Sequence, residues 1–128
     1  MKVGGPVCEH ENVTTVLIVD DHPSFRATAR ALLEAEGFDV LGEAADGASA
    51  IAAYEELHPD VVLLDVQLPD LTGFQVAARL TTNGTDVSVV LVSSRDGSDY
   101  GPLVEESGAL GFVPKGELSG ARIAALLE

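Results

Sequence analysis

The stretch Val61-Val62-Leu63-Leu64-Asp65-Val66-Gln67-Leu68-Pro69 decides the fold of this 128-residue chain. Its first four residues are apolar, and such a run is typical of a strand buried on both faces, as in the middle of a parallel sheet. The run ends at Asp65, whose ionised carboxylate loses hydration there and needs hydrogen bonds, a counter-ion or a metal nearby. Ligands bind at the carboxyl ends of strands in open α/β sheets. Asp65 is therefore the first candidate for chemistry.

Four further apolar runs, separated by helical patterns, extend this strand into a sheet. The predicted strands cover residues 16–19, 38–43, 61–64, 87–92 and 109–113. The predicted helices run from Pro23 to a stop at Gly37, from Asp46-Gly47, from Gly73, over Ser98–Ser107, and from about Leu118 to the end of the chain. On these helices we expect Phe25, Ala29, Leu32 and Leu33, then Ala48, Ile51, Ala52 and Leu57, then Phe74, Ala77, Ala78 and Leu80 to face inward.

Strands that alternate with helices across short loops favour a parallel sheet with helices on both faces. The sequence predicts a flavodoxin-like (βα)5 three-layer α/β sandwich with strand order 2-1-3-4-5. That order places the three most apolar strands, the first, third and fourth, inside the sheet.

Composition predicts one folded domain over residues 16–128, preceded by a flexible lead-in at 1–15 that contains Gly4, Gly5 and Pro6. The net charge of −14 leaves no basic surface for a nucleic acid, so we expect no direct nucleic-acid binding by this chain. Cys8 is the single cysteine, which excludes an intrachain disulfide and favours a cytoplasmic setting. No apolar run is long enough to predict a membrane span or a signal peptide.

Polar side chains follow four of the predicted strands, at the edge where their carboxyl ends meet. They are Asp20, Asp21, Asp65, Ser93 and Lys115. Three carboxylates in one cleft repel one another by about 4 kcal/mol per pair at ~4 Å and an effective dielectric near 20. Lys115 balances one charge, and Mg²⁺ is a divalent ion suited to balance the rest. Asp65 can then attack a phosphoryl group, and the Ser93 hydroxyl can donate to a phosphoryl oxygen.

The chain resembles the receiver domain of bacterial two-component response regulators over about residues 16–128. The resemblance depends on Asp20-Asp21-His22-Pro23, on Leu64-Asp65 through Pro69 with Gly73, on Ser93 after an apolar strand, and on Gly108-Ala109 through Phe112-Val113-Pro114-Lys115. The residues around Asp20 and Lys115 are most similar to those of regulators with a LuxR-type helix-turn-helix output. No such segment follows Leu127, so we expect either a stand-alone receiver or a chain cut at the domain boundary.

The resemblance implies a role for each of these residues. Asp65 would accept phosphoryl from a histidine kinase or phosphotransfer protein, and Lys115 and Ser93 would assist. Mg²⁺ would be held by Asp20, Asp21, Asp65 and the backbone carbonyl of Gln67. Ser93 and Phe112 would form a switch pair, with Phe112 replacing the frequent tyrosine. The side chains of Gln67 and Arg95 would tune phosphoryl lifetime.

Such a domain is not an enzyme with a separate substrate, because it catalyses only its own phosphorylation and dephosphorylation. Its output would be a partner-binding or homodimerisation face.

Three other functions remain as alternatives. A Mg²⁺-dependent phosphatase or phosphotransferase usually needs a second acid two residues after its nucleophile, where this chain has Gln67. A flavodoxin-like cofactor binder needs donors to a phosphate in its first loop, where Asp20 and Asp21 would repel one. A receiver-like interaction module that acts without phosphorylation is the serious alternative.

Overall fold

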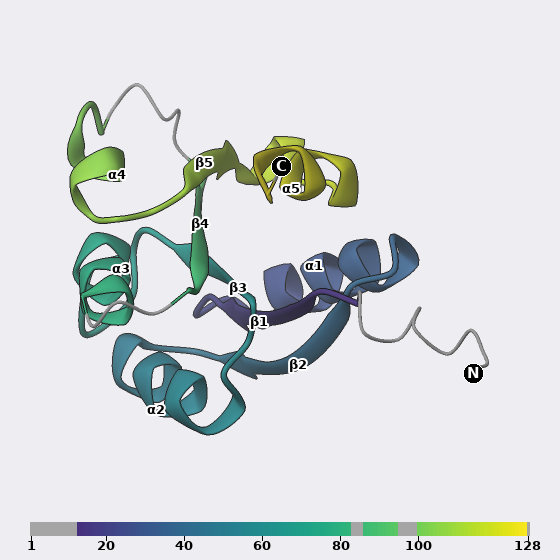
Figure 1. Ribbon diagram of the computed structural model, residues 1–128, viewed down its shortest axis with the longest axis horizontal. Coiled ribbons are helices and arrows are strands. Elements are labelled where there is room, and N and C mark those ends of the chain that lie inside the picture. The colour runs from purple at the N-terminus through teal and green to yellow at the C-terminus, as the bar shows by residue number, and fades with distance from the viewer. Residues whose placement is uncertain (1–12, 83–85, 95–99, 128) are drawn as a thin grey trace.

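The computed structural model describes residues 13–82, 86–94 and 100–127, which form a three-layer α/β sandwich (Figure 1). The five strands are parallel and lie in the order β2-β1-β3-β4-β5, which confirms the predicted fold. The strands are β1 (Thr15–Val19), β2 (Asp39–Ala44), β3 (Val61–Asp65), β4 (Ser88–Ser93) and β5 (Gly111–Pro114). The α-helices are α1 (Pro23–Ala35), α2 (Gly47–Leu57), α3 (Gly73–Thr81), α4 (Leu103–Glu106) and α5 (Gly120–Leu127), with a 3₁₀ turn at Lys115–Glu117.

Helices cover both faces of the sheet, so alternate residues of each central strand enter two separate cores. Ile18 and Leu63 pack with α1 and α5 on one face. Leu17 and Leu64 pack with α2 and α3 on the other face, where residues of α4 also contact the core. All five residues of β3 are buried, which explains its uninterrupted apolar sequence.

The strand register aligns the carboxyl ends of the central strands. Val19 of β1 pairs with Leu64 of β3, and Asp65 pairs with Val92 of β4. Ser93 in turn pairs with Pro114 of β5. The last residue of β3 and the residues that directly follow β1 and β5 therefore come together at one edge of the sheet.

The predicted inner faces of three helices were partly wrong. Leu32 of α1 is 38% exposed, because Ala29 and Leu33 point directly into the core and turn Leu32 outward. In α2, Ala48 and Ala52 are exposed and Ala50 is buried instead. Ala78 of α3 is exposed beside the buried Val76 and Ala77. In such alanine-rich segments the hydrophobic pattern barely separates one face from the next.

The helix predicted over Ser98–Ser107 was too long. Residues 95–99 lie outside the described part of the chain, and α4 begins only at Leu103. Gly101 has a φ of +55°, which a right-handed helix does not allow, so the described chain turns before α4 begins. The strand boundaries were predicted to within two residues; β1 begins at Thr15, the last residue of the predicted lead-in.

Candidate functional site

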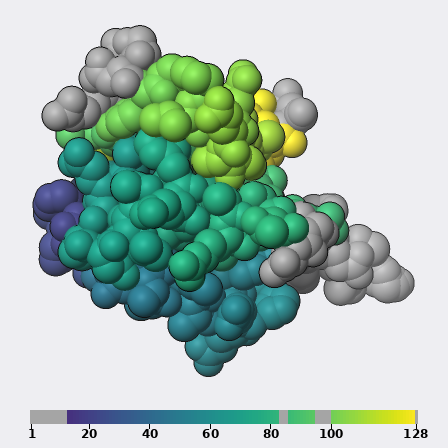
Figure 2. Space-filling model, turned by 90° about the vertical axis from the view of Figure 1, so that its left-hand side faces the viewer, coloured from purple at the N-terminus to yellow at the C-terminus, as the bar shows by residue number. Residues whose placement is uncertain are grey.

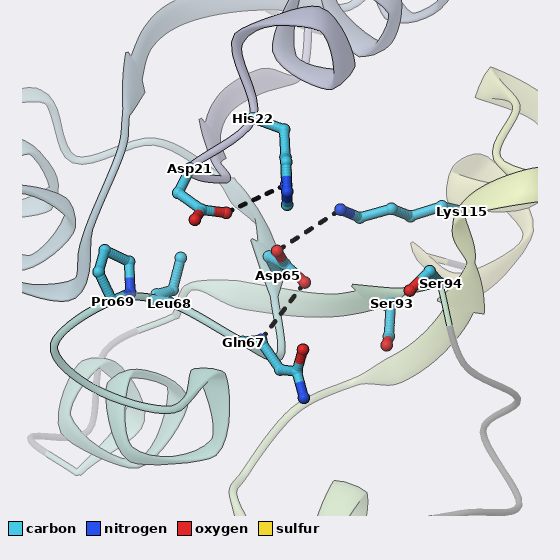
Figure 3. Close-up of a pocket in the computed structure, with 9 residues that line it drawn as sticks. All are labelled: Asp21, His22, Asp65, Gln67, Leu68, Pro69, Ser93, Ser94 and Lys115. Atoms are coloured by element: carbon cyan, nitrogen blue, oxygen red, sulfur yellow. Dashed lines mark hydrogen bonds and ion pairs between the residues drawn. The ribbon is translucent and has the colours of Figure 1, made fainter.

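A cleft of about 290 Å³ opens at the carboxyl edge of the sheet, above the ends of β3 and β4 (Figure 3). Its lining comes from the loops after β1, β3, β4 and β5. The lining residues are Asp21, His22, Asp65, Gln67, Leu68, Pro69, Ser93, Ser94 and Lys115. The structure therefore brings together strand ends that are far apart in the sequence.

Asp65 lies at the floor of this cleft as the last residue of β3 and is 4% exposed. One carboxylate oxygen accepts a 3.3 Å hydrogen bond from the backbone N–H of Gln67, and the other lies 3.5 Å from the Lys115 ammonium. Burial, followed by repulsion from Asp20, raises the pKa of Asp65 to about 6, against the attraction of Lys115. The surroundings of Asp65 therefore stabilise its ionised form less well than water does.

Asp20 is fully buried beside Asp65 and shares its lysine. Its Oδ1 accepts a 2.8 Å hydrogen bond from the backbone N–H of His22. Its Oδ2 lies 2.7 Å from Lys115 Nζ, but it accepts no well-formed hydrogen bond from any described residue. Lys115 Nζ also lies 4.5 Å from the centre of the Phe25 ring, a cation–π contact that holds the ammonium between the two carboxylates.

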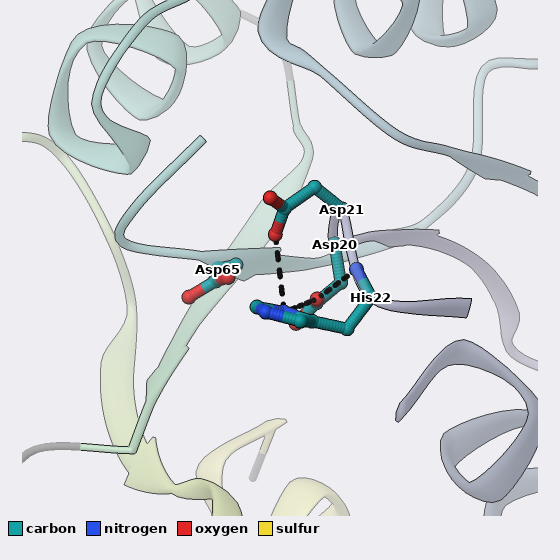
Figure 4. Close-up of side chains that lie close together, drawn as sticks. All are labelled: Asp20, Asp21, His22 and Asp65. Atoms are coloured by element: carbon teal, nitrogen blue, oxygen red, sulfur yellow. Dashed lines mark hydrogen bonds and ion pairs between the residues drawn. The ribbon is translucent and has the colours of Figure 1, made fainter. Parts of the chain in front are cut away.

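Asp21 and His22 complete the rim on the β1 side (Figure 4). His22 Nδ1 lies 3.0 Å from an oxygen of Asp20 and 3.1 Å from an oxygen of Asp21. One ligand atom from each of Asp20, Asp21, His22 and Asp65 lies within 4.8 Å of the others. His22 directly precedes α1, and its ring approaches both acids.

This donor set fits a hard divalent cation. The three acids offer carboxylate oxygens, the ligands that Mg²⁺ prefers. Asp20 Oδ2 is buried with the Lys115 ammonium at 2.7 Å but accepts no well-formed hydrogen bond from a described residue, so a cation would give this oxygen a further partner. The acidic cluster of Asp20, Asp21 and Asp65 can therefore hold a metal ion.

Arg26 fixes the loop that contains the acid pair, a role that the sequence reading missed. Its Nη1 donates a 2.6 Å hydrogen bond to the backbone carbonyl of Asp20. Its Nε donates at 3.0 Å to Glu43 of β2, and Arg30 donates to the same carboxylate at 2.8 Å. Arg26 lies on the first turn of α1, four residues after His22. That position is the one feature of the sequence that could have indicated its contact with the Asp20 loop.

The β3–α3 loop is held by close backbone contacts. The N–H of Gly73 donates to the carbonyl of Val66 at 2.6 Å. A Cβ on Gly73 would collide with the backbone carbonyl of Asp65 and lie 2.8 Å from Val66 Cα, so only glycine allows α3 to start here. Asp70 in this loop accepts hydrogen bonds from the N–H groups of Gly47 and Ala48, and those bonds lower its pKa.

Ser93 is buried at the end of β4 and contacts an aromatic residue that we did not expect at the site. Its Oγ lies 2.8 Å from Tyr100 Oη, and either hydroxyl can be the donor of this hydrogen bond. The Tyr100 ring packs on Phe112 of β5 at 5.6 Å between ring centres. No motif in the sequence signals this contact of Tyr100 with Ser93. Arg95 lies outside the described residues.

Comparison with known proteins agrees with this geometry. The family model described as response regulator receiver domain matches residues 16–127. The chain therefore belongs to the response regulator receiver domain family, the phosphorylation-dependent switches of two-component systems.

Two curated relatives are transcription regulators. BvgA of Bordetella pertussis is 40% identical over 102 residues, which cover 80% of this chain and 49% of BvgA. EvgA of Escherichia coli K12, a DNA-binding transcriptional activator, is 36% identical over 110 residues, which cover 86% of this chain and 54% of EvgA. The chain thus spans about half the length of the curated relatives it matches.

Solved receiver domains have the same fold. The signal receiver domain of the response regulator NarL from Mycobacterium tuberculosis is 34% identical, with a TM-score of 0.79 over 90% of this chain and 97% of that one. A LuxR-family two-component response regulator from Aurantimonas is 30% identical, with a TM-score of 0.81 over 91% and 86% of the two chains. Among the described helices, none has the length and apolar character to span a membrane.

Proposed function

We propose that Asp65 is the phospho-acceptor of this receiver domain and takes its phosphoryl group from a histidine kinase or a phosphotransfer protein. The observation that supports this most directly is the position of the Asp65 carboxylate. It lies at the floor of an open cleft, 3.5 Å from a lysine ammonium and beside two further acids.

In the proposed step a carboxylate oxygen of Asp65 attacks phosphorus, and the bond from phosphorus to the donor's imidazole nitrogen breaks. The imidazole leaves with the electron pair of that bond. Lys115 stabilises the negative charge on the phosphoryl oxygens, and burial limits competition from water for that ammonium. Bound Mg²⁺, held by Asp20, Asp21, Asp65 and the Gln67 carbonyl, would supply further positive charge at this place.

The remaining site residues control the consequence of phosphorylation. Ser93 donates to a phosphoryl oxygen, and Phe112 responds by packing, since it has no hydroxyl. The Gln67 amide stands where an aspartyl phosphatase would have a general acid, so it cannot exchange protons with an attacking water. Together with Arg95 it tunes the lifetime of the phosphoaspartate. The domain modifies only itself.

The output is a change of surface read by another protein or by a second copy of this chain. The curated relatives are transcription regulators about twice as long. Nucleic-acid contact, where a longer protein makes it, belongs to its other half, because this chain has a net charge of −14.

Intact-mass spectrometry after incubation with acetyl phosphate and Mg²⁺ tests the phospho-acceptor. The wild-type chain should gain one phosphoryl group, while Asp65→Asn and a sample in excess EDTA should gain none. Since the chain has no tryptophan, mass rather than indole fluorescence is the appropriate readout.

A folded wild-type protein that gains no phosphoryl group would reject the proposal and favour an interaction module that acts without phosphorylation. Gain of the group by Asp65→Asn would move the acceptor elsewhere. Sedimentation of both forms then tests dimerisation.

A further inference from the structure

The hydroxyl groups of Ser93 and Tyr100 form a direct link between the cleft and the helical layer beside it. Their oxygens lie 2.8 Å apart, and Ser93 is 3% exposed. In the view of Figure 3 the Ser93 hydroxyl points away from the Asp65 carboxylate. The hydrogen bond with Tyr100 holds it in this orientation.

Tyr100 belongs to an aromatic cluster that includes the second predicted switch residue. Its ring meets Phe112 at 5.6 Å and Phe74 of α3 at 5.4 Å, the latter edge to face. Phe112 has no hydroxyl, so among these three rings the phenol of Tyr100 is the one polar group. It therefore provides the hydroxyl contact that Phe112 cannot make.

We propose that Tyr100 is a positioning residue that latches the Ser93 hydroxyl away from Asp65 in the unmodified protein and releases it when Asp65 is phosphorylated. This inference rests on the proposed function of Asp65. The Ser93 side chain places its hydroxyl in one staggered orientation at a time. Turning it toward a phosphoryl group therefore breaks its bond with Tyr100.

The exchange favours the phosphoryl group, because a hydrogen bond to a charged oxygen is roughly twice as strong as one between neutral groups. The cost is the bond with Tyr100, so the latch reduces the tendency of the unmodified protein to adopt the active arrangement. Removing only the phenol oxygen should lower that cost.

Release of Tyr100 would change the packing at the outer face of the molecule. Phe74, which contacts the Tyr100 ring, also lines a groove of about 250 Å³ between α3 and α4, together with Leu103. Leu103 is 46% exposed there. Figure 2 views this face, with α4 in light green above α3 in teal. The path runs from the cleft through Ser93, Tyr100 and Phe74 to this groove.

Carbon-13 NMR of protein labelled at tyrosine Cζ tests the latch directly, because the chain contains two tyrosines, Tyr54 and Tyr100. Tyr54→Phe assigns the signals and is the matched control, since Tyr54 lies on α2 and stacks on His58. Adding beryllofluoride with Mg²⁺, as a phosphoryl mimic, should shift the Tyr100 signal and leave that of Tyr54 in place. Ser93→Ala without any ligand should shift the Tyr100 signal in the same direction.

The affinity for beryllofluoride gives the second measurement. Tyr100→Phe should bind it roughly two- to tenfold more tightly than wild type, which is the value of one neutral hydrogen bond. Tyr54→Phe should bind like wild type. A Tyr100 signal that does not move on binding, or weaker binding by Tyr100→Phe, would overturn the latch. Absence of binding by the wild-type protein would instead reject the proposed function of Asp65.

Discussion

Replacing Asp65 with asparagine is expected to stabilise the fold at neutral pH. The Asp65 carboxylate is 4% exposed, and burial together with Asp20 raises its pKa from 3.8 to about 6. Ionising it in the folded protein therefore costs roughly 3 kcal/mol more than ionising it in the unfolded chain. Asparagine has nearly the same shape and avoids this cost.

The sign of the pH dependence follows from the proton count. Between pH 3.8 and about 6 the folded state holds the Asp65 proton more firmly than the unfolded state does. The contribution of Asp65 to the free energy of unfolding is therefore greatest at low pH and is lost as the pH rises through this range. The advantage of Asp65→Asn over wild type should grow by about 2 kcal/mol between pH 4.5 and pH 7.5.

Urea unfolding followed by circular dichroism in EDTA, at pH 4.5 and pH 7.5, measures this change. Comparing the two proteins at each pH cancels the titration of other groups. Asp86→Asn, which changes an exposed acid, is the control and should show no such growth. Mg²⁺ should narrow the gap at pH 7.5 by stabilising the wild-type protein. A gap of equal size at both pH values would refute the reasoning.

Three further perturbations test other parts of the site. Gly73→Ala should lower the free energy of unfolding by roughly 1–3 kcal/mol, because the added methyl group would be overpacked against the backbone of Asp65 and Val66. Gly116→Ala is the control and should not lower it, because a Cβ at that position would meet open space. Urea titration measures both changes. Arg26→Met should weaken Mg²⁺ binding by roughly three- to tenfold in an NMR titration, because the Asp20 carbonyl loses its hydrogen-bond donor. Arg30→Met is the control and should bind Mg²⁺ like wild type, because Arg30 donates to Glu43 and not to Asp20. Asp70→Asn should lower the melting temperature by more at pH 7 than at pH 3. The pKa of Asp70 is lowered in the folded protein, so the stability that its bonds to the start of α2 provide begins to decline as the pH falls below 3.8 and is lost as the pH falls through the folded-state pKa.

The fold was predictable because β1, β3 and β4 are buried on both faces, and their uninterrupted apolar runs mark them as central strands. The limits of the helices were less predictable. The start of α4 depends on the positive φ of Gly101, and the inward face of α2 depends on which of several alanines meets the sheet. Neither property is determined by hydrophobic spacing.

The centre of the site was predictable for a different reason. Asp65 is the last residue of a strand, and Asp20 and Lys115 each directly follow one; parallel topology brings such residues together whatever the loops do. Arg26 and Tyr100 reach the site through long side chains from other elements. Their contacts depend on where those side chains point, which a linear pattern does not contain.

The charges of this cleft explain why a divalent cation and a phosphoryl group suit it. Asp20, Asp21 and Asp65 face one ammonium, that of Lys115, which leaves a formal excess of two negative charges. A divalent cation balances this excess. Lys115 Nζ lies 2.7 Å from Asp20 Oδ2 and 3.5 Å from Asp65 Oδ2, so the ammonium interacts more strongly with Asp20. A metal cation that neutralised Asp20 would release this ammonium for Asp65 and for the oxygens of a group attached there, and would thereby couple cation binding to the proposed phosphorylation.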